Sequence, residues 1–144
     1  MAATKEQYAY LAGLIDGDGC VAFRKRKDSK TKSGFSYTSQ MIVTSKDEWF
    51  LLDLQKVFGG YMNKQGRSVF NGKQIWSLRF TSNQTREMLP KLIPHFVLKK
   101  QEAELLQKGL AITARHRFKD YSRDGLDEIV DKIKFLKKNR EVTI

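Results

Sequence analysis

Apolar residues recur at helical spacing near the start of the chain, at Tyr8, Leu11, Ala12 and Ile15. This spacing places them on one face of a helix. Thr4 is followed three residues later by Gln7, which is the pattern of a capping box. The chain therefore predicts an amphipathic helix over about residues 5–17. Two aspartates and two glycines lie at its end, and Gly17 and Gly19 allow left-handed backbone geometry there.

Alternating apolar and polar residues predict four strands, at residues 20–27, 35–45, 61–67 and 73–81. In the first strand Val21 and Phe23 point to one face, and Arg24 and Arg26 point to the other. The last two strands are joined across Asn71-Gly72, which is a turn dipeptide. The strands therefore form two hairpins.

The remaining apolar stripes predict helices. One covers residues 47–58 and ends at Gly59-Gly60. Ser82 caps a short helix that ends around Pro90 to Pro94. The C-terminal helices occupy about residues 95–139; the first runs from Pro94 to about residue 113, and the second starts at Asp124.

The order of elements is αββαββα, which indicates a single α+β domain over residues 1–144. Four antiparallel strands with helices on one face leave the other sheet face uncovered. Polar side chains are expected on this uncovered face, at Arg24, Arg26, Thr38, Gln40, Asn63, Gln65, Arg67, Ser77 and Arg79. Amides and guanidinium groups hydrogen-bond base edges, and arginine also binds phosphates. The pattern predicts a face that binds double-stranded DNA.

Composition supports a polyanionic partner. The 144 residues include 27 Lys and Arg against 16 Asp and Glu, which gives a net charge of +11. Cys20 is the single cysteine, so an internal disulfide and a zinc finger are excluded. With two histidines in the chain, any metal is expected to be bound by oxygen and to be Mg²⁺-like. The sequence shows no apolar signal region and no membrane-spanning run, so an intracellular protein is expected, in the cytoplasm of a prokaryote or in an organelle.

The end of the first helix is unusual. Its last turn should carry the negative end of the helix dipole, where cations are favoured. The chain instead places Asp16 and Asp18 there. Carboxylates at such an end need a positive partner, and a divalent metal is the expected one. Gly13 and Gly17 are four residues apart, a spacing that allows two helices to approach closely.

Residues 11–19 read LAGLIDGDG and match the signature of the LAGLIDADG homing endonucleases at eight of nine positions. The resemblance implies a saddle-shaped sheet and site-specific, metal-dependent cleavage of both DNA strands. It implies that Asp18 binds Mg²⁺ with help from the Gly17 carbonyl, and that Asp16 is structural. Mn²⁺ or Ca²⁺ is expected to substitute in binding. The basic residue that the family has before its long helix falls on Lys99, with Lys100 beside it.

A single copy of the motif implies a homodimer, paired through Gly13, Leu14 and Gly17, on a long, near-palindromic DNA site. Thr44-Ser45 stands where the family often has a glutamine. Two alternatives on the same scaffold remain open: a maturase that binds intron RNA, and a DNA-binding regulator without catalysis. An enzyme acting on a small phosphate is disfavoured, because the chain has no phosphate-binding glycine loop.

Overall fold

The structure is a computed structural model that describes residues 3–31, 34–114 and 125–142. Its elements follow the predicted αββαββα order, so the α+β assignment is confirmed. They are α1 (Lys5–Asp18), β1 (Gly19–Lys27), β2 (Phe35–Ser45), α2 (Glu48–Phe58), β3 (Tyr61–Arg67), β4 (Gln74–Arg79), α3 (Ser82–Leu92), the short 3₁₀ helix η1 (Ile93–His95), α4 (Lys100–Ala114) and α5 (Leu126–Val142).

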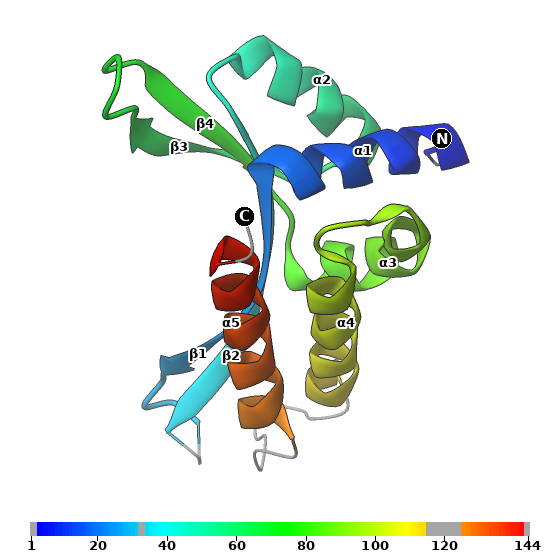
Figure 1. The fold of residues 1–144 in the computed structure, drawn as a ribbon, viewed down its shortest axis with the longest axis vertical. Helices are drawn as coiled ribbons and strands as arrows, with labels where there is room; N and C mark the ends of the chain where they lie inside the picture. The colour runs from blue at the N-terminus through cyan, green and yellow to red at the C-terminus, as the bar shows by residue number, and fades with distance from the viewer. Residues whose placement is uncertain (1–2, 32–33, 115–124, 143–144) are drawn as a thin grey trace.

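The four strands form one antiparallel sheet in the order β1-β2-β4-β3. The two central strands, β2 and β4, pair only over residues 42–45. The two hairpins therefore extend away from a short shared junction in different directions (Figure 1). The sheet presents a long surface rather than a compact one.

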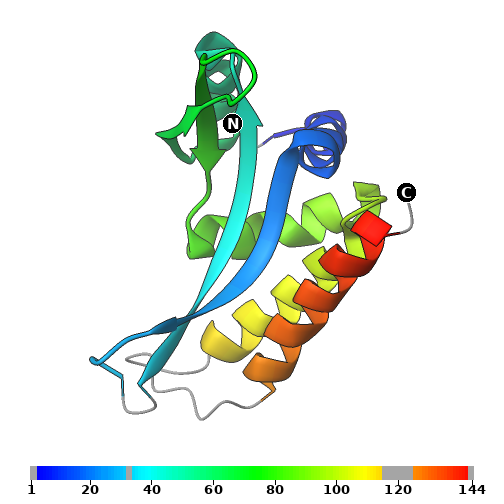
Figure 2. The same ribbon diagram turned by 60° about the vertical axis from the view of Figure 1, so that its left-hand side comes forward.

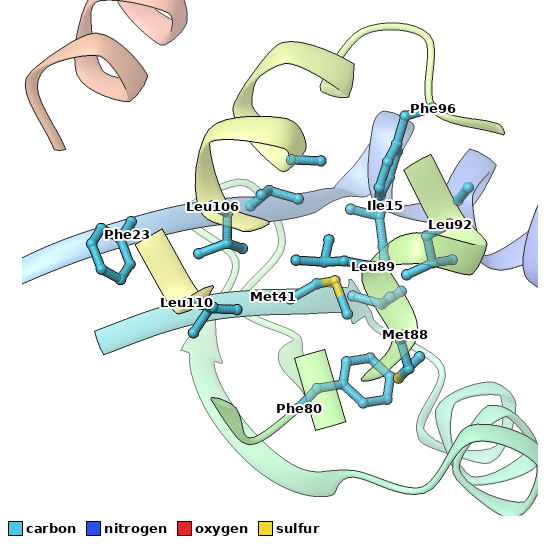
Figure 3. Close-up of a cluster of buried hydrophobic side chains, with 14 of the residues drawn as sticks. Ile15, Phe23, Met41, Phe80, Met88, Leu89, Leu92, Phe96, Leu106 and Leu110 are labelled. Carbon is cyan, nitrogen blue, oxygen red and sulfur yellow. The ribbon is translucent and has the colours of Figure 1, made fainter. Parts of the chain in front are cut away.

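Helices cover one face of this sheet, and α4 and α5 lie side by side along β1 (Figure 2). The covered face presents buried side chains that include Val21, Phe23 and Met41. Figure 3 shows side chains from α3 and α4 converging on Met41. Burying a side chain of this size contributes about 1.5–3 kcal/mol, so this layer holds the sheet in place.

The capping box at Thr4 and Gln7 forms as predicted, with both reciprocal hydrogen bonds present. At the other end α1 passes into β1 without a loop, since Asp18 ends the helix and Gly19 starts the strand. Gly17 and Gly19 do not use the left-handed geometry that glycine allows, because neither has a positive φ. Gly19 is needed for space, since a Cβ there would lie 2.4 Å from the Ile42 carbonyl oxygen.

The C-terminal half departs from prediction in its boundaries. α4 begins at Lys100 rather than at Pro94, which instead lies in η1. The cap of α3 is Thr81 rather than Ser82, and Pro90 lies inside that helix. The predicted start of the last helix at Asp124 lies outside the described residues; the described α5 runs from Leu126 to Val142. None of the helices in the described ranges is long and apolar enough to cross a membrane.

Candidate active site and nucleic-acid interface

Asp16 lies in the last turn of α1 and binds the segment that leads into α4. Its two carboxylate oxygens accept hydrogen bonds from the backbone N–H groups of Val97, at 2.7 Å, and Lys99, at 3.0 Å. Both oxygens are therefore engaged by the chain itself. This geometry agrees with a structural role for Asp16 and leaves Asp18 as the acid that faces outward.

Lys99 supplies the positive charge that the end of α1 lacks in its own sequence. The last turn of α1 has no basic residue. The Lys99 side chain is 8% exposed, and its Nζ donates a 2.6 Å hydrogen bond to the Asp16 carbonyl oxygen. A cation at a helix C-terminus is stabilised by the helix dipole. The positive partner expected at this helix end is thus partly provided by the protein.

The last carbonyl groups of a helix have no partner within the helix. At the end of α1 three of them find donors: Ile15 from the Gly19 N–H, Asp16 from Lys99, and Asp18 from the Thr44 hydroxyl at 2.7 Å. The Gly17 carbonyl belongs to the same last turn, one residue before Asp18. Gly17 and the Asp18 side chain are both exposed. A main-chain carbonyl and a carboxylate therefore lie next to each other at this exposed point.

These two oxygens fit a hard divalent cation. Within residues 3–31, 34–114 and 125–142, no three His, Cys, Asp or Glu side chains come together as a metal cage. Mg²⁺ commonly uses one or two carboxylates, keeps several waters and takes the remaining oxygens from substrate phosphates. Asp18 and Gly17 thus provide the partial ligand set that such a cation needs, whereas a preformed zinc or calcium site needs more ligands.

Asp18 also lines a polar hollow of about 390 Å³ between the end of β2 and the β3–β4 hairpin. Thr44 and Ser45 line this hollow at the position where the resemblance implies a glutamine. The Thr44 hydroxyl already donates a hydrogen bond to the main-chain carbonyl of Asp18. Lys46 and Lys73 add two cations to its walls. The sequence did not single out these lysines, because only the sheet register brings the hairpin next to Asp18.

The first hairpin presents its predicted side chains on the uncovered face. Arg24 and Arg26 are exposed, and Arg24 lies opposite Thr38 in the register. The Arg24 Nε donates a 2.7 Å hydrogen bond to Gln40. Lys25 points the other way and pairs with Asp127 of α5 at 3.0 Å. The predicted register of this strand is confirmed.

The second hairpin only partly follows the prediction. Asn63 lies opposite Ser77 in the register and shares the uncovered face with Arg79. Ser77 is fully buried, so it does not face a ligand; its hydroxyl accepts a 3.2 Å hydrogen bond from Arg79 and orients that side chain.

A β-bulge between Lys64 and Gly66 shifts the end of β3. Arg67 therefore pairs with Gln74, on the side of the sheet that also carries Leu78, and its guanidinium donates to the Gly72 carbonyl in the turn. The assignment of Arg67 to the uncovered face is corrected, because one extra residue reverses which face a side chain meets. Gln65 is the extra residue of the bulge.

The glycines of α1 lie on an open surface. Gly13 and Gly17 are exposed, and a Cβ at either position would meet no atom within 4 Å. Leu14 between them is half-buried and packs partly against the core. These glycines are therefore not required by packing within one chain.

Comparison with known proteins identifies the family of the chain. The family model described as LAGLIDADG endonuclease matches residues 11–108. The DNA endonuclease I-CvuI of Chlorella vulgaris is 30% identical over 103 residues, which are 69% of this chain and 61% of that protein. The match thus spans less than two thirds of that relative's length.

Two solved structures share the fold. I-CvuI in complex with its target in the presence of calcium has a TM-score of 0.73 at 21% identity, over 92% of this chain and 82% of its own. I-SmaMI bound to uncleaved DNA with calcium ions has a TM-score of 0.70 at 27% identity, over 89% of this chain and 43% of its own. The family model covers more than half of the sequence, including the helix end that carries Asp18. The chain belongs to the LAGLIDADG endonuclease family.

Proposed function

We propose that this protein is a site-specific DNA endonuclease that works as a homodimer and requires a divalent metal, with Mg²⁺ as the physiological ion. The observation that carries the proposal is the end of α1. There an exposed carboxylate, Asp18, adjoins the main-chain carbonyl of the exposed Gly17, and the buried Lys99 binds the neighbouring Asp16 carbonyl. I-CvuI and I-SmaMI, which share the fold, have each been crystallised with DNA and calcium.

Asp18 and Gly17 would hold the metal. When bound, a divalent cation neutralises charge on the scissile phosphate and helps water to attack it. Asp16 keeps its two hydrogen bonds to the backbone N–H groups of residues 97 and 99, and so fixes the helix end in position.

Lys99 would act on the same phosphate. Its Nζ is held against the Asp16 carbonyl, one residue from Gly17. A fixed cation near an oxygen that gains negative charge stabilises the transition state without reorganisation. Lys99 is therefore proposed as the second catalytic residue, and the exposed Lys100 is not.

DNA would lie along the uncovered face of the sheet. The major groove admits a two-stranded β-ribbon, and arginine and glutamine side chains distinguish bases there. Arg24, Arg26, Thr38, Gln40, Asn63 and Arg79 are proposed to reach the bases. The net charge of +11 favours binding to the phosphate backbone around them.

Cleavage of both strands would require two copies of the chain, since each copy supplies one Asp18. The exposed Gly13 and Gly17 allow two α1 helices to approach closely about a two-fold axis. Tyr10, three residues before Gly13 on α1, is also exposed in the single chain. A symmetric dimer of this kind would read a near-palindromic site.

The position of Asp18 favours a nuclease over a regulator that only binds DNA. An exposed carboxylate beside a phosphate repels it unless a cation lies between them. A protein that only needs affinity would be better served by a neutral residue there. A maturase activity on intron RNA would use the same basic face, and it is a possible second outcome of the experiment below.

The test is cleavage of a randomised duplex library in the presence of Mg²⁺, followed by sequencing of the ends. We expect double-strand breaks at one near-palindromic sequence, and none with EDTA. Asp18→Asn protein should bind the recovered sequence and leave it intact. If the wild-type protein cuts no duplex but binds structured RNA, the endonuclease proposal fails.

A further inference from the structure

The turn between β3 and β4 exposes two neighbouring apolar side chains. Val69 is 92% exposed and Phe70 is 95% exposed, more than any other large hydrophobic residue among those described. Figure 1 shows this turn projecting away from the helices. Single exposed apolar residues are common, but an adjacent pair on a projecting turn indicates a contact with another molecule.

The turn is held in one conformation by its own hydrogen bonds. The Ser68 N–H donates to the Lys73 carbonyl at 2.8 Å, and the Gly72 N–H donates back to Ser68 at 2.9 Å. The Ser68 hydroxyl accepts from the Phe70 N–H at 3.2 Å, and Arg67 donates to the Gly72 carbonyl at 3.0 Å. Gly72 has a φ of +68°, which its lack of a side chain permits. The Phe70 ring is thus presented from a defined backbone.

The base of the turn lies next to the proposed cleavage site. Ser68, Asn71 and Lys73 form one wall of the 390 Å³ hollow whose other wall includes Asp18. A duplex that brings a phosphate to Asp18 therefore passes close to the turn. Because the β3–β4 hairpin is a two-stranded ribbon, the groove that admits it is the major groove.

The positive charge around the turn indicates which kind of molecule binds there. Residues 54–86 contain no Asp or Glu and six Lys or Arg, of which Arg67 and Lys73 flank the apolar pair. A surface of this kind attracts a polyanion. Together with the shared hollow, this favours the cleaved DNA itself over a separate protein partner.

We infer that Phe70 reads a base pair beside the cut, through contact of its ring with the C5-methyl group of a thymine in the major groove. Phenylalanine is one of the side chains that recognise thymine in this way. The inference rests on the proposed DNA cleavage and extends it to a specificity determinant. It extends sequence recognition from the sheet face, where Asn63 and Arg79 lie, to the turn of the same hairpin.

The first experiment compares Phe70→Ser with wild-type protein on every single-base variant of the target recovered from the library. Phe70 contributes almost nothing to the core, so the variant should fold normally by circular dichroism. We expect about tenfold weaker binding to the best target, which corresponds to about 1.4 kcal/mol. We also expect the thymine preference to disappear at one position of each half-site. Phe135→Ser, at a 63% exposed position on α5, is the matched control and should behave as wild type.

The second experiment replaces that thymine by deoxyuridine, which removes only the methyl group. Wild-type protein should bind the deoxyuridine duplex about tenfold more weakly than the thymine duplex. Phe70→Ser protein should bind the two duplexes equally well. If Phe70→Ser keeps the wild-type base preference, or weakens binding equally on all sequences, the inference is overturned while the endonuclease proposal stands. If wild-type protein cuts no duplex, the proposed function itself fails.

Discussion

The ammonium group of Lys99 donates a 2.6 Å hydrogen bond to the main-chain carbonyl of Asp16. The carboxylate of Asp16 in turn accepts the backbone N–H of Lys99 at 3.0 Å. The side chain of each residue thus binds the main chain of the other, although the two residues are 83 positions apart in sequence. This reciprocal contact fixes a buried cation at the end of the helix that carries Asp18.

Replacing Lys99 by methionine should reduce cleavage much more than DNA binding. Methionine keeps most of the buried stem but removes the charge, and loss of one fixed donor at a transition state typically costs about 10²–10³ in rate. Single-turnover cleavage and binding of the same duplex give the two quantities. Lys100→Met changes the exposed neighbour and should cleave normally. Equal losses in the two variants would remove Lys99 from the catalytic assignment.

Asp16→Asn should lower stability. The amide offers one acceptor in place of two, so one of the N–H groups of Val97 and Lys99 loses its partner. The Lys99 bond is partly buried and the Val97 bond is exposed, so the loss should be that of a hydrogen bond to a charged group, about 1.5–3 kcal/mol at most. Urea unfolding measures the change in the free energy of unfolding. Asp53→Asn is the control, because its 3.6 Å ion pair with Lys56 is largely exposed and contributes little. A loss no larger than that of the control would contradict the structural role.

Local sequence patterns predicted α1 and three of the four strands to within one residue, because capping, alternation and turn dipeptides act over short distances. They failed where distant residues decide the outcome. In the segment before α4, which is not helical, the N–H groups of Val97 and Lys99 donate to the Asp16 carboxylate rather than to backbone carbonyl groups. The β-bulge in β3 places Arg67 on the opposite face of the sheet from the one predicted. Ser77 is fully buried and is not available to a ligand.

The candidate site was predictable in part. The signature at residues 11–19 indicates Asp18 and Gly17 directly. It does not show which groups donate to the carbonyls of Ile15, Asp16 and Asp18 at the helix end, because those donors come from β1, β2 and the segment before α4. The hollow formed with Lys46 and Lys73 likewise depends on pairing between strands that are distant in sequence.

Asp18→Asn should abolish cleavage and leave DNA binding equal or tighter, since it removes a negative charge close to a phosphate. The measurement is binding by fluorescence anisotropy beside cleavage with Mg²⁺. Asp131→Asn, on the exposed side of α5, should bind and cut as wild type does. Normal cutting by Asp18→Asn would show that the metal-binding acid has been misassigned.

Gly13→Leu should disrupt the dimer without unfolding the chain. A Cβ at this position meets no atom of its own chain within 4 Å, so a larger side chain has room in the monomer. Overpacking a close helix–helix contact typically costs about 1–3 kcal/mol. Light scattering should show a shift to monomer, whereas Ala111→Leu on the exposed side of α4 should remain dimeric. A wild-type protein that binds its target as a stable monomer would refute the two-fold arrangement.

Arg24 and Lys25 are neighbours on β1 that point to opposite faces. Arg24 faces the uncovered side and is oriented by Gln40, whereas Lys25 pairs with Asp127 at 3.0 Å and lies over the Phe35 ring. Arg24→Ala should therefore relax preference at one base pair of each half-site, by about 1–3 kcal/mol of discrimination. Lys25→Ala should leave base preference unchanged and at most flatten the salt dependence of binding by about one phosphate contact. A binding profile over all single-base variants of the target distinguishes the two. Identical, uniform losses in both variants would mean that Arg24 does not read a base, because of these two residues only Arg24 lies on the uncovered face.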